Sequence, residues 1–300
     1  MIYEYALEPE ALSDWQTARY LLDQFGVPHG RLVSQFPKSW KRCAYDACSG
    51  CSPIDKKRIE ELLSKVGPKL IRTGREYGSS DTWVANALRS HREHPFRAIL
   101  GRRESVSPGI QDAAEVGPET PGWIPDGGPI PRTPDAITLA ARFLMSGAKK
   151  IRLIDPRYSC AQRHNGPLKD IVDLVRSETS ANVIEYHVLA NGTSEWFQGK
   201  LEGQDLHRVR TALRDREIHF YRWKPIEGGE AFHARYILTD RGGLEYDYGL
   251  DSGSPGQTTN VHRMPDSLHR QRWKLFDHDS QEFVLQEVFR LTSNSVSKIS

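Results

Sequence analysis

The chain has few cysteines, almost no net charge and no long apolar run. Lys plus Arg total 41 against 39 Asp plus Glu in 300 residues. This balance gives no global attraction for nucleic acid or membranes, so an anionic partner has to be bound by local clusters. No run reaches the roughly 18 apolar residues of a membrane span, and the start "MIYEYALEPE" lacks the features of a signal peptide. We therefore expect a cytoplasmic protein without a membrane partner.

Three of the four cysteines, Cys43, Cys48 and Cys51, lie close together, and Cys160 is far downstream. This spacing does not match a paired disulfide framework and suits a reducing compartment. The three thiols could bind zinc if His29 or Cys160 supplied a fourth ligand. The favoured alternative is that Cys43 and Cys48 are small buried apolar residues near a helix. We accordingly expect no metal and no other cofactor.

A stretch rich in proline and glycine divides the chain at residues 107–134, "SPGIQDAAEVGPETPGWIPDGGPIPRTP". Such a stretch cannot sustain a helix, and its prolines remove backbone donors from any sheet. It is the best candidate linker, and the alternative is an ordered strap pinned to the surface by Trp123 and Ile124. The expected organisation is an N-terminal region of residues 1–106, this linker, and a domain of residues 135–300.

The N-terminal region is predicted to be mainly helical. Apolar residues recur at steps of three and four in residues 9–26, and Gly26 follows as a C-cap. Residues 52–67 repeat the pattern between a serine or aspartate start and a glycine stop. Residues 79–95 predict a third helix, capped by Ser80 or Asp81 and ended before Pro95.

Between the first two helices, residues 30–42 are basic with interleaved aromatics. The residues of interest are Arg31, Lys38, Trp40, Lys41 and Arg42. This composition is typical of a surface that contacts nucleic acid, and it is also the composition of an ordinary amphipathic edge. A partner protein that binds through the N-terminal region is a further expectation.

After the linker, helical and extended patterns alternate. Helices are predicted at residues 134–147, 167–178 and 201–215, and strands at residues 149–155, 181–190, 217–223 and 232–239. This alternation favours an α/β domain whose parallel or mixed sheet is flanked by helices. Functional loops gather at the carboxyl ends of strands in such sheets, and "DPRYS" follows the first strand.

One segment, "FHARYILTD", combines residue types that phosphodiester chemistry requires. On a strand His233, Arg235 and Thr239 share one side, and Asp240 comes at the strand's end. Cleavage of a phosphodiester needs a nucleophile, a cation for the developing charge and a carboxylate to orient the imidazole. His233, Arg235 and Asp240 supply one of each. The alternative is a buried hydrogen-bonded cluster without function.

The spacing His233-x-Arg235-x4-Asp240, followed by a glycine turn and "GLD" at residues 249–251, resembles the HxK(x4)D motif of the phospholipase D superfamily, with arginine in the lysine place. The segments "IRLIDPRYS" and "RQRWKLF" are also similar to single-motif phospholipase-D-like domains, including those at the C-terminus of some MIT-domain proteins. The resemblance covers roughly residues 135–290. No family is recognised in residues 1–105.

The resemblance implies a phospholipase-D-like fold and a metal-independent mechanism. His233 would be the nucleophile or the acid that protonates the leaving group, Asp240 its orienting partner, and Arg235 the phosphate ligand. Family enzymes use two such motifs, and only one is present here, so an active enzyme would be a homodimer. Arginine in the lysine place preserves phosphate binding better than transition-state geometry.

Further substrate-binding candidates surround the motif. Asp155, Arg157 and Tyr158 follow the neighbouring strand, although "DPRY" is equally a proline turn that starts a helix. Thr239 and Asp251 belong to the motif region. Thr258, Thr259 and Asn260 are candidates for the small and amide residues that follow the family motif.

The leading hypothesis is therefore a phosphodiesterase, and more specifically a nuclease, because the basic aromatic stretch favours nucleic acid over lipid. The alternative is an inactive adaptor that binds phosphate or nucleic acid in a multi-protein bacterial assembly, such as a phage defence system. Related single-motif domains include members that bind phosphoinositide headgroups, so a phospholipid is a third candidate ligand.

Overall fold

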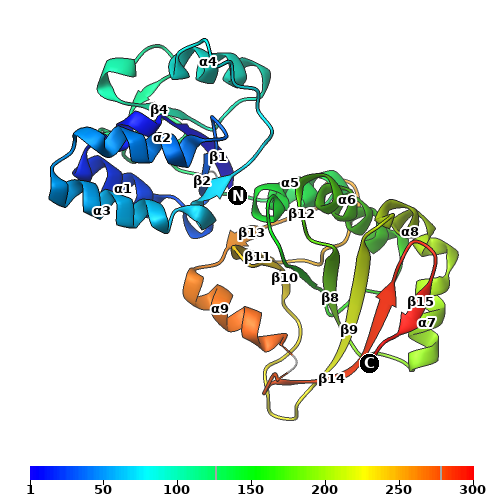
Figure 1. Ribbon diagram of the computed structural model, residues 1–300. Coiled ribbons are helices and arrows are strands. Elements are labelled where there is room, and N and C mark those ends of the chain that lie inside the picture. Colours follow the sequence, from blue (N-terminus) through cyan, green and yellow to red (C-terminus); the bar gives the residue numbers. More distant parts are fainter. Residues whose placement is uncertain (126, 278) are drawn as a thin grey trace. The chain divides into compact units, whose positions relative to one another are not determined.

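The computed structural model describes residues 1–125, 127–277 and 279–300 and divides into two compact units, residues 1–126 and 127–300 (Figure 1). The second unit is α/β, as expected. The first unit is also α/β and not mainly helical as expected, because each unit has a sheet flanked by helices. Within the described ranges, no helix has the length and apolarity that crossing a membrane requires.

The first unit contains a parallel sheet with strand order β3-β2-β1-β4-β5. Its strands are β1 (Tyr3–Leu7), β2 (Arg31–Ser34), β3 (Leu70–Ile71), β4 (Ile99–Gly101) and β5 (Gln111–Asp112). Its α-helices are α1 (Trp15–Gln24), α2 (Trp40–Ala47), α3 (Pro53–Ser64) and α4 (Trp83–Glu93). Short 3-10 helices are η1 (Pro9–Ser13), η2 (Val27–His29), η3 (Cys48–Gly50), η4 (Gly67–Lys69) and η5 (Arg103–Ser105).

Capping residues fix the helix ends in this unit. The Asp14 carboxylate accepts a hydrogen bond from the Thr17 N–H at the start of α1. Gly26, just past the end of α1, has a φ of 137°, which side chains disfavour. Thr82 caps α4 by accepting from the Ala85 N–H, so the cap lies one or two residues later than expected. The helix ends before Pro95, as predicted.

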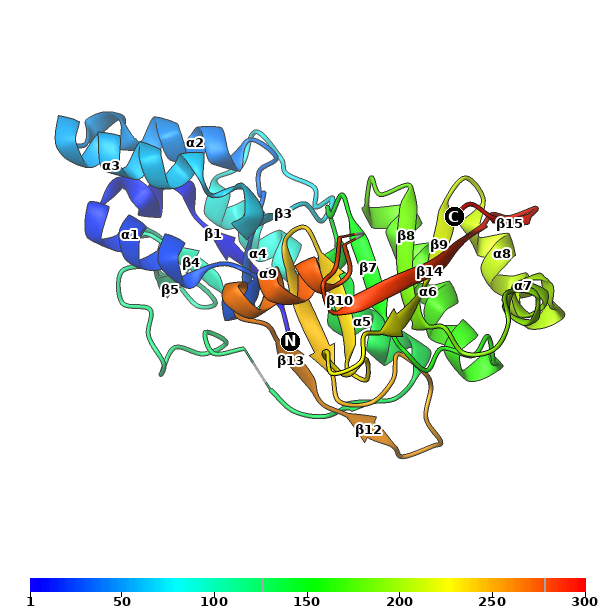
Figure 2. The same cartoon turned by 90° about the horizontal axis from the view of Figure 1, so that it is seen from below.

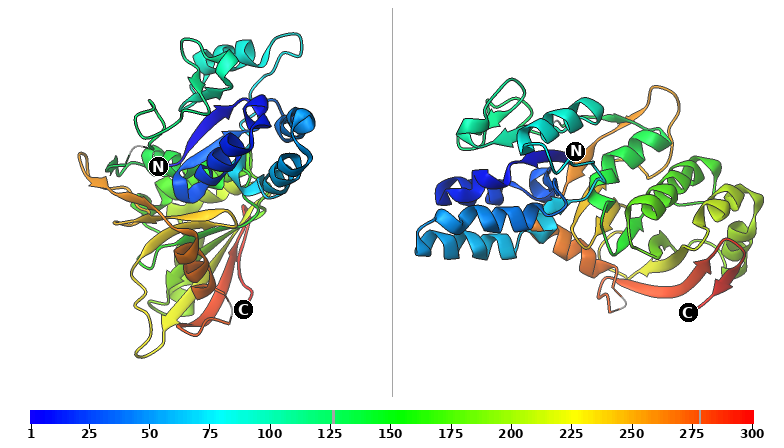
Figure 3. Two further views of the ribbon diagram at one scale, coloured as in Figure 1. Left: turned by 90° about the vertical axis from the view of Figure 1, so that its left-hand side faces the viewer. Right: turned by 45° about the horizontal axis from the view of Figure 1, so that its top comes forward.

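Side-chain alternation along β1 divides the core of the first unit into two layers. Tyr5 and Leu7 join the apolar cluster formed with α1, α2 and α3, whereas Ala6 joins the cluster formed with α4. Helices therefore cover both faces of the sheet; in Figure 3 the blue α1 and the cyan α4 lie on opposite sides of β1. The sequence analysis identified α1, α3 and α4 but missed this sheet.

Residues 107–134 do not form a separate linker, which corrects the expected organisation. β5 pairs with β4 of the first unit, and Trp123 is 3% exposed in that unit's core, where its ring lies edge-on to Tyr5 and Phe25. Ile130 belongs to a strand of the second unit. The prolines and glycines are accommodated because these segments run in short turns between brief pairings.

The second unit contains an eight-stranded mixed sheet with order β13-β11-β10-β7-β8-β9-β14-β15, and a separate pair of β12 and β6. The strands are β6 (Ile130–Pro131), β7 (Ile151–Ile154), β8 (Val183–Leu189), β9 (Glu217–Pro225), β10 (Arg235–Thr239), β11 (Gly242–Tyr246), β12 (Thr258–Thr259), β13 (Val261–Arg263), β14 (Phe283–Leu291) and β15 (Val296–Lys298). The helices are α5 (Pro134–Met145), α6 (Gln162–Glu178), α7 (Ser194–Glu202), η6 (Gln204–Leu206), α8 (His207–Leu213) and α9 (Asp266–Leu275).

The directions of the strands determine which candidate site residues of this unit lie near one another. β7, β8 and β9 are parallel to one another, and β10 is antiparallel to β7. The carboxyl end of β7 and the start of β10 therefore lie at the same edge of the sheet. Helix α9 covers one face, and α5 and α6 cover the other (Figure 2). The Arg152 side chain donates to the Trp273 carbonyl of α9 on the first of these faces.

We predict that Trp123→Ala lowers the free energy of unfolding of the first unit by about 3–5 kcal/mol, because it removes a buried aromatic side chain from a packed core. The matched control is Ile124→Ala, since Ile124 is 58% exposed and its loss changes stability by about 0.5 kcal/mol or less. Denaturant unfolding of both variants measures the difference. Equal stability of the two variants would contradict the assignment of residues 107–125 to this unit.

Candidate functional site

The candidate functional site of the second unit lies at the end of the sheet where β7 ends and β10 begins. This row of strand ends is called the edge below. Tyr236 of β10 pairs with Ile154 of β7, so Arg235 lies next to Asp155 at this edge. β11 ends at the same edge, because Tyr246 pairs with Arg235. The edge thus brings together residues that are far apart in the sequence, which is what a binding site needs.

Arg235 has an unusual environment. Tyr236 and Leu238 belong to the apolar cluster next to α9, so alternation directs Arg235 to the face covered by α5. The Tyr246 hydroxyl opposite Arg235 donates to the Ile137 carbonyl of α5, in agreement with this orientation. Arg235 Nε is buried and has no hydrogen-bond partner among the described residues. The Nε atoms of four other arginines, Arg132, Arg216, Arg222 and Arg272, are buried without a partner in the same way, but each of those guanidinium groups is bound through another nitrogen. Among the described residues no group forms a hydrogen bond or ion pair with the guanidinium of Arg235, and buried donors are usually paired in native proteins.

His233 is not part of the strand, contrary to expectation. β10 begins at Arg235, and His233 lies exposed in the turn before it, where its backbone N–H donates to the Ala231 carbonyl. The strand alternation that was expected to align His233 with Arg235 therefore does not apply. The two residues nevertheless lie two positions apart at the same edge.

Asp240 is at the wrong end of β10 to orient His233, and this corrects the proposed triad. The five residues of β10 separate the two side chains, a span of roughly 16 Å. Asp240 Oδ1 instead accepts hydrogen bonds from the Lys149 and Lys150 N–H groups, at 2.9 and 3.2 Å, before β7 begins. Its carboxylate holds the turn between β10 and β11 to the opposite edge of the sheet.

Thr239 is also far from the candidate edge. It is fully buried next to Asp240, and its Oγ1 accepts a hydrogen bond from the Arg241 N–H. Its role is to shape the turn after β10, so it is removed from the expected substrate-binding set.

Asp155 lies at the edge, but both of its carboxylate oxygens are already hydrogen-bonded within the chain. It is completely buried, and its two carboxylate oxygens accept from the Arg157 N–H at 3.0 Å and the Leu250 N–H at 2.9 Å. Tyr158 is 7% exposed and donates its hydroxyl to Asn165, so it packs in the core and does not line a surface. Arg157 is exposed at the same edge.

Asp251 is the centre of an ion-pair cluster that the sequence analysis did not find in full. It binds Arg132 at 2.6 Å and Arg163 at 3.4 Å. A Cβ placed on Gly249 would lie 2.5 Å from an Asp251 carboxylate oxygen and 3.1 Å from one of Asp155. Only glycine therefore fits between these two carboxylates. Arg132 and Arg163 carried no sequence signal, because neither belongs to a motif or lies near Asp251 in the chain.

Pro167 helps to place Asp251. It lies inside α6 and has no N–H, so the Arg163 carbonyl one turn earlier lacks its helical donor. The Ser252 N–H donates to that carbonyl at 2.8 Å. An interruption in the helix thus becomes the anchor of the loop that follows "GLD".

His164 is a third residue of this cluster without a sequence signal. It is 2% exposed, and its Nδ1 lies 3.3 Å from the Ser159 hydroxyl. Burial lowers the pKa of His164, and the nearby carboxylates of Asp155 and Asp251 oppose that shift. Asn260 also lies at this edge, where its amide donates to Asp247 at 2.7 Å.

A separate buried network lies under α9. Trp223 Nε1 donates to His187 Nδ1 at 2.9 Å, and His187 is fully buried. Because the indole nitrogen is only a donor, Nδ1 has to stay unprotonated. Burial lowers the pKa of His187 to about 4. His187 is therefore a neutral core residue at physiological pH.

In the first unit, the basic aromatic stretch is only partly a surface. Trp40 is completely buried and donates its indole N–H to the Leu7 carbonyl at 2.6 Å. Arg31 is 8% exposed, and its guanidinium donates to the Trp123 carbonyl and stacks on the Trp123 ring. Both are removed from the expected nucleic-acid contacts. Lys38 and Arg42 are exposed and Lys41 is half-buried.

The cysteine cluster does not form a zinc site within the described part of the chain, where no group of three or more metal-binding side chains occurs. The Cys48 thiol is buried and donates to the Ala44 carbonyl, and the Cys51 thiol donates to the Ser13 carbonyl. Burial raises the pKa of Cys48 to about 11, so it remains a thiol. Cys48 is thus the small buried residue expected, whereas Cys43 is only half-buried, contrary to expectation.

The crevice between β1 and β4, where the direction of strand addition reverses, is filled by the protein itself. Glu8 follows β1 and is 4% exposed. Its carboxylate accepts from the Arg102 N–H at 2.7 Å and the Ser105 hydroxyl at 2.9 Å. Burial raises the pKa of Glu8. Ligands often bind at such a reversal point, but here a carboxylate occupies it.

Comparison with known proteins adds no relative. The chain matches no known family model, and no curated protein is significantly similar to it. The function therefore has to be argued from the geometry of the edge.

We predict that Asp240→Ala lowers the free energy of unfolding by about 1–2 kcal/mol, because two backbone N–H groups lose a charged acceptor. Asp240→Asn keeps an acceptor oxygen and should lose less. Denaturant unfolding measures both variants. An unchanged stability of Asp240→Ala would show that the two hydrogen bonds do not hold the turn.

We also predict that acid weakens the second unit through His187. The pKa of His187 is about 4 in the folded protein, against about 6.5 in an unfolded chain. The unfolded chain therefore takes up a proton first, and stability falls as the pH drops from 6.5 to 4, by up to about 3 kcal/mol. His187→Gln, which keeps an acceptor for Trp223, should flatten this part of the stability profile. His262→Gln, at a largely exposed side chain, is the control that should not.

Proposed function

We propose that the second unit is a phosphate-binding module whose ligand is a phosphodiester of nucleic acid, held by Arg235. The observation that carries the proposal is the buried Arg235 Nε without a partner in the described chain. An unpaired buried donor costs about 1–3 kcal/mol, and a phosphate removes that cost. The planar guanidinium also matches two phosphate oxygens at once.

The charges around Arg235 support an anionic ligand. Arg157 is exposed, the Arg163 side chain is 61% exposed, and His233 is exposed next to Arg235. The carboxylates of Asp155 and Asp251 are bound to backbone N–H groups and to arginines, so they do not compete for Arg235. The free hydrogen-bonding capacity of this edge therefore comes mainly from cations.

An exposed aromatic ring favours nucleic acid over an isolated phosphate. Tyr248 is 56% exposed, two residues after β11 ends, and the Arg132 guanidinium lies 5.0 Å from its ring. Stacking of a base on such a ring contributes about 1–3 kcal/mol and tolerates any base. The resemblance to phospholipase-D-like domains agrees with a phosphate ligand, because even the inactive members of that group bind phosphates.

Hydrolysis is the second candidate function, and the exposed His233 two residues before Arg235 is the observation in its favour. Asp240 is not available to orient it, so the imidazole would need a partner from the substrate or from a second copy of the chain. Binding without turnover is therefore the function that the geometry supports best, and an adaptor role follows from it.

We predict that Arg235→Ala weakens binding of a labelled single-stranded oligonucleotide roughly tenfold to a hundredfold, because one charge-assisted phosphate contact is lost. The plot of log K against log salt concentration should become shallower, its negative slope losing about one in magnitude. Fluorescence anisotropy across a salt series, with EDTA present, measures both quantities. Arg290→Ala removes the same charge from an exposed site at the opposite end of the sheet and is the control.

The same samples decide between binding and hydrolysis. Intact oligonucleotide after long incubation supports a binding module. Cleavage that is lost in His233→Ala would establish the phosphodiesterase instead. Equal affinity of Arg235→Ala and the unmodified protein would overturn the assigned phosphate site.

A further inference from the structure

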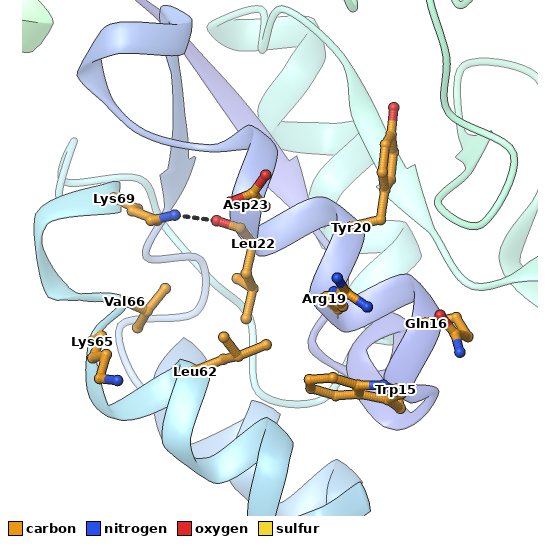
Figure 4. Close-up of a pocket in the computed structure, with 10 residues that line it drawn as sticks. All are labelled: Trp15, Gln16, Arg19, Tyr20, Leu22, Asp23, Leu62, Lys65, Val66 and Lys69. Carbon is orange, nitrogen blue, oxygen red and sulfur yellow. Dashed lines mark hydrogen bonds between the residues drawn. The ribbon is translucent and has the colours of Figure 1, made fainter. Parts of the chain in front are cut away.

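A groove in the first unit lies between α1 and the end of α3. Figure 4 shows Leu22 of α1, Leu62 and Val66 along its floor and the Trp15 indole at one end. Leu22 and Val66 are buried in the core of the unit. The cavity measures about 800 Å³. Trp15 and Leu62 are only partly buried against the core cluster, so their apolar surface remains for a ligand to cover.

Cations border this floor on both sides. Arg19 projects from α1 and Lys65 from the end of α3, with Leu22 and Leu62 between them (Figure 4). Arg19 is exposed, and the described residues give it no hydrogen-bond or ion-pair partner. Lys65 is 71% exposed, and its ion pair with Glu61 lies on the surface, where such pairs contribute about 0–1 kcal/mol. Both cations are therefore available to a ligand.

The remaining charges at the groove are partly committed. Lys69 donates to the Leu22 carbonyl, as the dashed line in Figure 4 shows. Asp23 is the one carboxylate among the residues that line this cavity. When Glu61, the ion-pair partner of Lys65, is counted with Asp23, three cations stand against two carboxylates, so the rim keeps a positive excess of one charge.

We propose that this groove binds an acidic amphipathic helix of a partner protein. The apolar residues of such a helix, spaced at three and four, would cover Trp15 and Leu62, and its flanking carboxylates would meet Arg19 and Lys65. From Trp15 to Asp23 the groove follows about 12 Å of α1, the length of two helical turns. A groove between two helices offers no open strand edge, so an added helix fits it and an added strand does not.

Two synthetic peptides test the proposal with the full chain. Both are 18 residues long and carry the same leucine face at i, i+3, i+4 and i+7, and one has glutamate and the other lysine on its polar face. Fluorescence anisotropy should show the acidic peptide binding at least tenfold tighter. Trp15→Ala should weaken that binding at least fivefold while circular dichroism stays unchanged.

Charge reversal is the decisive variant. Arg19→Glu with Lys65→Glu should reverse the preference toward the basic peptide. Lys38→Glu with Arg42→Glu makes the same change in net charge on exposed residues outside the groove and should leave the preference intact. Equal loss in both double variants would mean a general charge effect and would overturn the site. The helical partner would be overturned if the unmodified protein bound both peptides equally well. It would also be overturned if the protein bound an oligonucleotide more tightly than the acidic peptide and Arg19→Glu with Lys65→Glu abolished that binding.

Discussion

The buried carboxylate of Asp155 holds the functional edge of the second unit together. One oxygen binds the N–H of Arg157, which shapes the turn after β7, and the other binds the N–H of Leu250, which belongs to the segment after β11. A charge that is fully removed from water has to be satisfied in this way or it destabilises the fold by several kcal/mol. Because the partners come from segments far apart in the chain, the satisfied charge fixes their relative position, and with it the place of Arg235.

The α/β architecture of the second unit and most helices of both units could be predicted from periodicity, because α1, α3, α4 and α5 are long and amphipathic. The sheet of the first unit could not. β3 and β5 have two residues each, which is too short for any pattern. β1 is covered by helices on both faces, so it lacks the alternation that marks a half-exposed strand. The role of Trp123 was hidden for a similar reason, since its partners Tyr5 and Phe25 are remote in sequence.

The candidate site was predicted in part, and the error has a simple geometric cause. Arg235, Asp155 and Asp251 were selected from the sequence, and they do lie at one edge. Asp240 was selected because its spacing after His233 and Arg235 resembles the family motif, but a strand carries each residue about 3.3 Å further along. His233 and Asp240 are therefore close in the sequence but lie at opposite ends of the strand. The residues that do surround Asp251, which are Arg132, Arg163 and His164, come from other elements and cannot be found by spacing.

The sign of the ligand follows from which charges the fold has already neutralised. Asp155 and Asp251 each have partners within the chain, and Pro167 even releases a carbonyl that anchors the loop next to Asp251. Arg132 is bound to Asp251 although its own Nε is unpaired, whereas the described residues give no nitrogen of the Arg235 guanidinium a hydrogen bond or ion pair. Satisfied carboxylates beside an open guanidinium donor are the basis on which we propose an anionic ligand. The proposal of a nucleotide chain as that anion rests on the exposed Tyr248 ring, on which a base can stack.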